Sequence, residues 1–235
     1  MHRIALALLL VLGMAGVGGG AAELAHELTR GPTRAEMAAA VQQELASRWQ
    51  RLPAGKIFPA TVSYSTSDFD VAMTATRVGI APAATCGAAL DPAVSALLRR
   101  FGCVTVLRAT YVDESGVLAA TAGVAVMTSA AAASGVVGIG DTSPPGLAGA
   151  GVRTFSLPGT VADLFGDPQR RAFSAIDANH GRYIFFWTAG YTDGRASGSA
   201  TTTPALVDLG DGIILGVQAA FTAHGGACEM KDIRC

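Results

Sequence analysis

Charged residues are scarce in this sequence, and positive charge is not in excess. Only 15% of the 235 residues are charged, and the formal net charge is −1. A nucleic-acid partner would require a basic stripe along one face of the protein, so we expect no such partner. Alanine and glycine are abundant instead, and we attribute this bias to a high-GC bacterial genome rather than to a particular fold.

Familiar catalytic and metal-binding motifs are also missing. The sequence has no C-x-x-C pair, no H-E-x-x-H motif and no G-x-S-x-G motif, which disfavours zinc sites and α/β-hydrolases. The glycines of residues 135–140 do not have the spacing of a dinucleotide-binding loop. We therefore predict no catalytic residue, no cofactor and no metal site.

The four histidines, His2, His26, His180 and His224, do not form a recognisable catalytic pattern. We expect His180 to end a helix, where its charged form would suit the helix dipole. A catalytic role would require a positioned partner such as Asp177. The structural interpretation is the simpler one.

Four cysteines, Cys86, Cys103, Cys228 and Cys235, all follow an apolar N-terminal segment. An even number of cysteines in an exported chain indicates two disulfides formed in an oxidising compartment, although three connectivities are possible. We predict the two short loops, Cys86–Cys103 and Cys228–Cys235. The alternative is four buried thiols in a cytosolic protein.

Residues 4–22 contain no charged side chain, and they follow Arg3. At about 1.5 Å per residue the segment spans about 28 Å, close to the hydrocarbon thickness of a bilayer. Positive charge in front places the N-terminus in the cytoplasm, so we expect a single-pass anchor in the cytoplasmic membrane. The alternative is a cleaved signal peptide ending near Gly20-Ala21-Ala22, which would release a secreted protein.

A stalk-like helix is expected next. Thr33 and Glu36 fit a capping box, in which the hydroxyl and the carboxylate satisfy free N–H groups at the helix start. Apolar residues then recur every four positions on one face of this helix, and Pro53 ends it. The face could dock on the globular part of the same chain, which is the simpler interpretation, or on another envelope protein. The apolar residues are Met37, Val41, Leu45 and Trp49.

The following residues predict a helix and a hairpin. Asp91 and Pro92 form an N-cap with proline at the first helical position, and Gly102 ends the helix. We expect strands at residues 103–112 and 117–127, joined by a turn at Asp113, and a short alanine-rich helix from Ser129.

A second unit with the same order is predicted 80 residues later. Asp167-Pro168 opens a helix through Ile176, residues 182–191 form a strand, and a shorter strand near 197–202 precedes a final helix. Residues 109–113 (ATYVD) match residues 189–193 (AGYTD). Possible strands at 60–65 and 152–156 precede the two units, so each unit is βαββα.

The repeat pairs Tyr111 with Tyr191 and Asp113 with Asp193. These four residues are the candidate ligand-facing positions, as two halves of one site. The alternative is that each aspartate only stabilises a tight turn through its own backbone. Asp208 and Asp211, three residues apart on the final helix, are expected to face solvent.

A set of segments covers most of the chain beyond the anchor: Trp49 with residues 52–59 (LPAGKIFP), residues 102–111, residues 189–195 and the terminal Cys228 and Cys235. In these segments the sequence resembles a family of uncharacterised actinobacterial single-pass membrane-anchored proteins. The resemblance implies a single-pass topology with the C-terminal domain outside the cytoplasm, and it implies no activity, cofactor or catalytic residue.

We therefore expect an α+β fold, in which a duplicated βαββα unit forms a mainly antiparallel sheet with helices on one face. A membrane anchor or signal segment (1–22) and a stalk helix region (23–55) precede an extracytoplasmic domain (56–235), whose half-repeats are about 56–140 and 150–225. The expected function is a non-enzymatic binding or interaction module of unknown ligand. The alternative is a cell-envelope hydrolase with an unrecognised active site.

Overall fold

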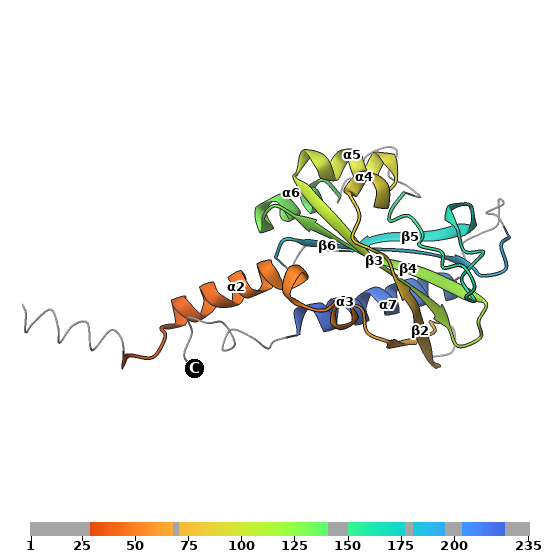
Figure 1. Cartoon of the computed structure of the whole chain (residues 1–235), viewed down its shortest axis with the longest axis horizontal. Coiled ribbons are helices and arrows are strands. Elements are labelled where there is room, and N and C mark those ends of the chain that lie inside the picture. The colour runs from red at the N-terminus through yellow and green to blue at the C-terminus, as the bar shows by residue number, and fades with distance from the viewer. Residues whose placement is uncertain (1–28, 68–70, 141–149, 177–180, 196–203, 224–235) are drawn as a thin grey trace, which may run out of the picture. The chain divides into compact units, whose positions relative to one another are not determined.

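A computed structural model describes residues 29–67, 71–140, 150–176, 181–195 and 204–223. The chain divides into two compact units, Met1–Val41 with Gly225–Cys235 and Gln42–His224. The described ranges do not include the anchor segment, the predicted Cys228–Cys235 pair or the four histidines. The larger unit is an α+β fold (Figure 1).

The larger unit is built on one six-stranded antiparallel sheet. The strand order is β1-β2-β3-β4-β6-β5, so β1 and β5 form the two edges. The strand β2 was not predicted from the sequence. The strands are β1 (Thr61–Ser65), β2 (Ala72–Ile80), β3 (Cys103–Asp113), β4 (Leu118–Met127), β5 (Arg170–Ile176) and β6 (Tyr183–Tyr191).

Helices cover both faces of the sheet, which corrects the expectation of helices on one face (Figure 1). The reason is visible in β4, where nine consecutive residues after Leu118 are buried. A strand buried on both sides needs an apolar layer above and below it. Val124 and Val126 pack in the cluster that contains α7 (Pro204–Thr222), whereas Ala125 and Met127 pack in the cluster of α4, α5 and α6.

The helix α7 lies against β1, β4, β5 and β6. By length and composition it could cross a membrane, and it is the one such helix among the described residues. Its apolar side is nevertheless buried on the sheet, and Leu206, Leu209, Ile213 and Phe221 are 0% exposed. We therefore assign α7 as a core helix.

Three glycines allow α7 to approach the sheet closely. A methyl group added at Gly210, Gly212 or Gly216 would lie under 3.0 Å from Trp187, Tyr64 or Val62, respectively. Glycine is unfavourable inside a helix, so its presence at these contact positions indicates that close packing decides the residue.

The second half of α2 (Arg34–Arg51) packs on the same face as α7. Leu45 and Trp49 contact the core, and Tyr183 donates its hydroxyl to the Leu45 carbonyl at 2.6 Å. This part of the stalk helix thus docks within the chain. In the smaller unit the capping box is confirmed. The Glu36 carboxylate accepts the Thr33 N–H at 2.7 Å, and the Glu36 backbone N–H donates to the Thr33 hydroxyl at 3.2 Å.

A buried ion pair joins α2 to the end of α7. The Arg48 side chain pairs with Glu44, one turn earlier, and both residues are almost fully buried. The Arg48 guanidinium also donates to the carbonyls of Phe221 and Ala223, at 2.6 and 2.9 Å. It therefore satisfies free carbonyls at a helix C-terminus, where a positive charge is favourable.

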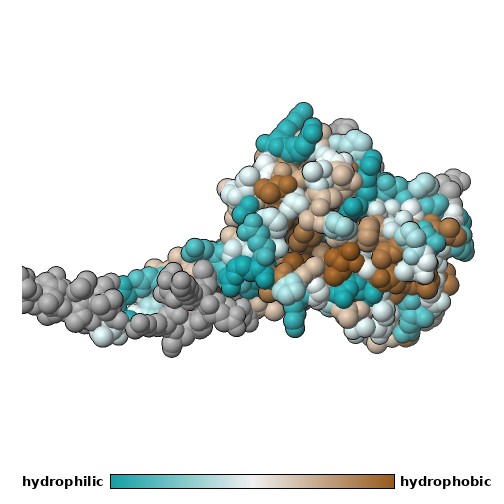
Figure 2. Space-filling model, in the orientation of Figure 1, coloured by the Kyte–Doolittle hydropathy of each residue, from teal (hydrophilic) through white to brown (hydrophobic). Residues whose placement is uncertain are grey.

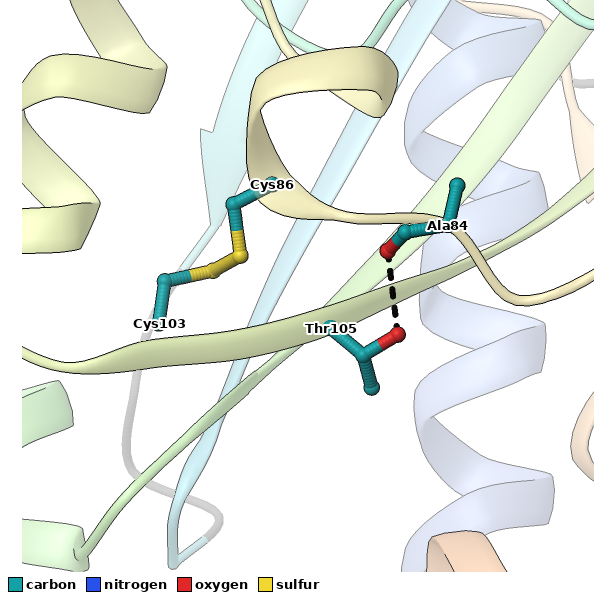
Figure 3. Close-up of a disulfide and its surroundings, with 4 residues drawn as sticks. All are labelled: Ala84, Cys86, Cys103 and Thr105. Carbon is teal, nitrogen blue, oxygen red and sulfur yellow. Dashed lines mark hydrogen bonds between the residues drawn. A yellow bond between two sulfur atoms is a disulfide. The ribbon is translucent and has the colours of Figure 1, made fainter.

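The opposite face carries three helices: α4 (Cys86–Ala89), α5 (Pro92–Arg100) and α6 (Ala130–Gly140). The predicted Cys86–Cys103 disulfide is confirmed and links α4 to the first residue of β3 (Figure 3). The Thr105 hydroxyl donates to the Ala84 carbonyl at 3.0 Å beside it. The bridge and this hydrogen bond hold the loop before α5 against β3.

The predicted second βαββα unit is wrong in two respects. A 3-10 helix, η1 (Asp167–Gln169), is followed directly by the strand β5, where a helix through Ile176 was expected. The matching residues 109–113 and 189–193 end β3 and β6, which both pair with β4. Because β6 also pairs with β5, both of its edges are occupied by described strands. The expected strand at residues 197–202 lies outside the described residues.

Candidate functional site

The candidate aspartate Asp113 stabilises the turn between β3 and β4. Its Oδ1 atom accepts the N–H groups of Val117 and Leu118, at 3.1 and 2.8 Å. Its Oδ2 atom accepts the N–H and hydroxyl of Ser115, at 3.2 and 2.5 Å. Asp113 therefore accepts hydrogen bonds from its own turn, which was the alternative to a ligand-facing role.

The candidate Tyr111 is a core residue. Its side chain is 0% exposed, and its hydroxyl donates to the Pro59 carbonyl at 2.9 Å. Burial raises the pKa of this phenol well above its usual value, and the nearby charge of Arg77 opposes the rise only in part. Tyr111 thus anchors the segment before β1 and does not reach the surface.

Tyr191 and Asp193, by contrast, lie at the surface where β6 ends. The guanidinium carbons of Arg171 and Arg195 lie 5.4 and 4.5 Å from the centre of the Tyr191 ring, within the range of cation–π attraction. Asp193 accepts both the side chain and the backbone N–H of Arg195, and these hydrogen bonds lower the pKa of Asp193. The ion pair is exposed.

Residues 157–166 place further apolar side chains beside this end of the sheet. Hydrogen bonds between residues three apart form successive turns there, and such turns place positions i and i+3 on one side. Ala162 and Phe165 face inward and are 0% exposed, whereas Val161 and Leu164 are 57% and 60% exposed. One apolar pair completes the core, and the other is left in solvent.

A backbone hydrogen bond and two close approaches bring these parts together at one end of the sheet. Thr192 donates its N–H to the carbonyl of Val117. The residue Val117 is 45% exposed. A methyl group added at Gly194 or at Gly116 would lie 3.3 Å from Leu164 or 3.7 Å from Val161. In Figure 2, apolar residues gather over the sheet and extend toward this end. We call Val117, Val161, Leu164, Tyr191 and Arg195 the turn-end surface.

The fold brings the four candidate residues to the same end of the sheet, but it does not bring them to one site. Tyr111 and Asp113 lie on β3, Tyr191 lies on β6, and β4 separates the two strands. Of the four candidates, only Tyr191 belongs to the turn-end surface, and Asp193 binds Arg195 of that surface. The apolar residues there were missed because they are exposed only in the context of the turns at 157–166.

Two further carboxylates have structural roles that the sequence did not suggest. Asp211 on α7 accepts the indole N–H of Trp187 at 2.8 Å, and Asp208 accepts the N–H and hydroxyl of Ser67, at 2.9 and 3.0 Å. The expectation that this pair faces solvent is wrong for Asp211, whose contact with Trp187 is part-buried, whereas the contact of Asp208 with Ser67 is exposed. The indole N–H of a buried tryptophan usually requires a hydrogen-bond acceptor. This requirement was the signal that could have predicted the role of Asp211.

Asp91, expected as the N-cap of α5, makes no side-chain cap hydrogen bond. Its carboxylate binds the Arg170 guanidinium in a bidentate pair, at 2.7 and 2.9 Å, and accepts the Gly151 N–H at 2.9 Å. Burial by itself would raise the pKa of Asp91. The hydrogen bonds from Arg170 and Gly151, with the charges of Arg170 and Arg153, outweigh burial and lower this pKa.

No three His, Cys, Asp or Glu side chains converge on a metal-binding position within the described ranges. Comparison of this chain with protein-family models, curated proteins and solved structures finds no match.

Proposed function

We propose that this chain is an extracytoplasmic, membrane-anchored binding domain that contacts its partner through the turn-end surface. The location is supported by the Cys86–Cys103 disulfide, because such bridges persist in oxidising compartments. It is also supported by the uncharged segment at residues 4–22 behind Arg3, and by the resemblance to actinobacterial single-pass proteins. Protease added to intact spheroplasts should therefore degrade the domain, and protection would refute this topology.

The observation that carries the binding role is the exposure of three neighbouring aliphatic side chains. Val117, Val161 and Leu164 are 45–60% exposed at one end of the sheet. A single exposed aliphatic residue is ordinary, but a contiguous apolar patch rimmed by polar groups marks interaction surfaces. Tyr191 and Arg195 follow at the end of β6, where the Thr192 backbone is bound to Val117, and tyrosine and arginine are enriched at protein interfaces.

Site-specific photo-crosslinking tests the role of this surface. A photoreactive phenylalanine analogue at Val161 should give a discrete adduct in intact envelopes. The same analogue at Leu215 should give none, because Leu215 is equally exposed, at 56%, but lies on the outer side of α7. Adducts of equal yield at both positions, or at neither, would contradict the proposal.

Charge substitutions provide an independent readout. Leu164→Asp should abolish the adduct formed from Val161 with little change in melting temperature, because the side chain already lies in solvent. Leu215→Asp is the matched control and should leave the adduct intact. If Leu164→Asp retains the adduct, the contact does not involve the turn-end surface.

A further inference from the structure

Two arginines on the α4/α5 side of the sheet each have a buried guanidinium N–H without a hydrogen-bond partner among the described residues. Arg108 lies on β3, and its Nη1 atom donates to the carbonyls of Arg153 and Thr154, at 3.1 and 3.2 Å. Its Nε–H is buried and has no hydrogen-bond partner in the described part of the chain. The Nε–H of Arg153 is in the same condition.

Nearby carboxylates do not supply the missing acceptors. Asp91 is occupied by Arg170, and its Oδ1 atom lies 3.9 Å from the Nε atom of Arg153. The Oδ2 atom of Asp167 lies 3.8 Å from that Nε atom, and its Oδ1 atom accepts from Thr154. Distances of 3.8 and 3.9 Å give charge attraction without a hydrogen bond.

The local charge is positive. Three guanidinium groups, from Arg108, Arg153 and Arg170, face two carboxylates, from Asp91 and Asp167. Burial lowers the pKa of Arg108, the attraction of Asp167 opposes this effect, and the charge of Arg153 adds to it. An arginine is nevertheless always charged in proteins, so the cluster holds an excess of positive charge and two buried N–H donors without a hydrogen-bond partner among the described residues, which is unfavourable.

The site is open to solvent on one side. The Arg153 side chain is 40% exposed, whereas Arg108 is held at the base by its two carbonyl partners and by the ring of Phe155, 6.0 Å from its guanidinium carbon. A ligand would therefore meet the more exposed Arg153 first, and Arg108 is held in place by its two carbonyl partners.

We propose that Arg108 and Arg153 bind an oxyanion, a phosphate or carboxylate group that offers an acceptor oxygen to each guanidinium. Planar, charged donors on two arginines match the geometry of such groups. The site lies apart from the turn-end surface and does not depend on its role. The anion is either a free ion or a group carried by an envelope polymer.

Binding is tested on the full-length chain in detergent micelles by isothermal titration with inorganic phosphate, acetate and soluble polyphosphate. Saturable binding of phosphate or acetate is expected. A polyphosphate affinity that exceeds the free-ion affinity per phosphate group would indicate a polymer-borne ligand, and equal affinities would indicate a free ion. No saturable binding of any of the three probes would overturn the proposal.

Three variants, each of which removes one positive charge, test the location of the site. Arg108→Gln and Arg153→Gln should each weaken binding by about tenfold or more, the scale expected for a lost charge-assisted hydrogen bond. Arg100→Gln, at an exposed position of α5, should change affinity by less than about twofold because rim charges contribute little.

An equal effect of all three variants would show general charge attraction and would overturn the assigned site. If Arg108→Gln fails to fold, the exposed Arg153→Gln still decides the outcome, since unchanged affinity in that variant contradicts the proposal. The crosslink from Val161 should be unaffected in Arg153→Gln, so this test and that of the turn-end surface can fail separately.

Discussion

Gly210→Ala should destabilise the domain although alanine is the better helix former. A Cβ atom at position 210 would lie at most 2.6 Å from three atoms of the Trp187 indole ring. The ring cannot move aside easily, because Trp187 is 1% exposed and its N–H is bound by Asp211. The helix α7 must therefore shift away from β6.

Two opposing terms give the magnitude. Replacing glycine by alanine inside a helix gains about 1 kcal/mol of propensity, whereas overpacking a close contact costs about 1–3 kcal/mol and sometimes more. A shift of α7 would also disturb the contacts of Gly212 and Gly216 with β1. We expect a net loss of about 1–2 kcal/mol, or a fall in melting temperature of about 2–8 °C for a domain of this size.

Urea unfolding followed by far-UV circular dichroism measures this change. Gly55→Ala in α3 (Ala54–Ile57) is the matched control, because its nearest neighbour, the Arg77 Nη1 atom, would lie at an ordinary 3.8 Å. The control should be neutral or slightly stabilising. Combining Gly210→Ala with Trp187→Phe should cost less than the sum of the two single changes. A Gly210→Ala protein as stable as the native one would refute the close-packing explanation.

Three further changes test other contacts. Cys103→Ser opens a loop with a sequence separation of 17, so the free energy of unfolding should fall by roughly 3 kcal/mol, and a reducing agent should produce the same loss in the native protein but none in the variant. Asp91→Asn weakens the pair with Arg170. Because the pKa of Asp91 is lowered in the folded protein, the contribution of its carboxylate to stability is present above the unfolded pKa of about 4 and is lost at lower pH. The difference in stability between the variant and the native protein should therefore shrink below about pH 4 in an acid titration. Asp211→Ala leaves the Trp187 N–H without its acceptor and should cost about 1–3 kcal/mol in chemical denaturation, whereas Asp211→Asn, which keeps an acceptor oxygen, should cost less.

Local signals in the sequence determined several elements of this fold. Pro92 and Gly102 bracket α5, whose bounds Pro92–Arg100 agree with the prediction. The β-branched run after Cys103 forms β3. The capping box of Thr33 and the Cys86–Cys103 bridge follow equally from short-range spacing. Each of these features involves residues close in sequence, so propensity, capping and loop length are sufficient to predict them.

Other features depended on partners distant in sequence. Asp167-Pro168 carries the same start signal as Asp91-Pro92, yet η1 and β5 follow it, because β6 offers a free edge for pairing. Tertiary hydrogen bonding can override a local helix preference. The similar residues 109–113 and 189–193 end two strands, β3 and β6, that both pair with β4.

The candidate surfaces were decided almost entirely by tertiary structure. A two-residue period shows that side chains alternate along a strand, but it does not show which side a neighbouring segment covers. Tyr111 became buried because α7 covers its side of the sheet, and Tyr191 stayed at the surface because its strand ends there. Likewise, the buried donors of Arg108 and Arg153 exist only because residues 151–157 cross the other face. Sequence therefore determined local elements and one bridge, whereas chain packing decided which polar and apolar groups remain available to a partner.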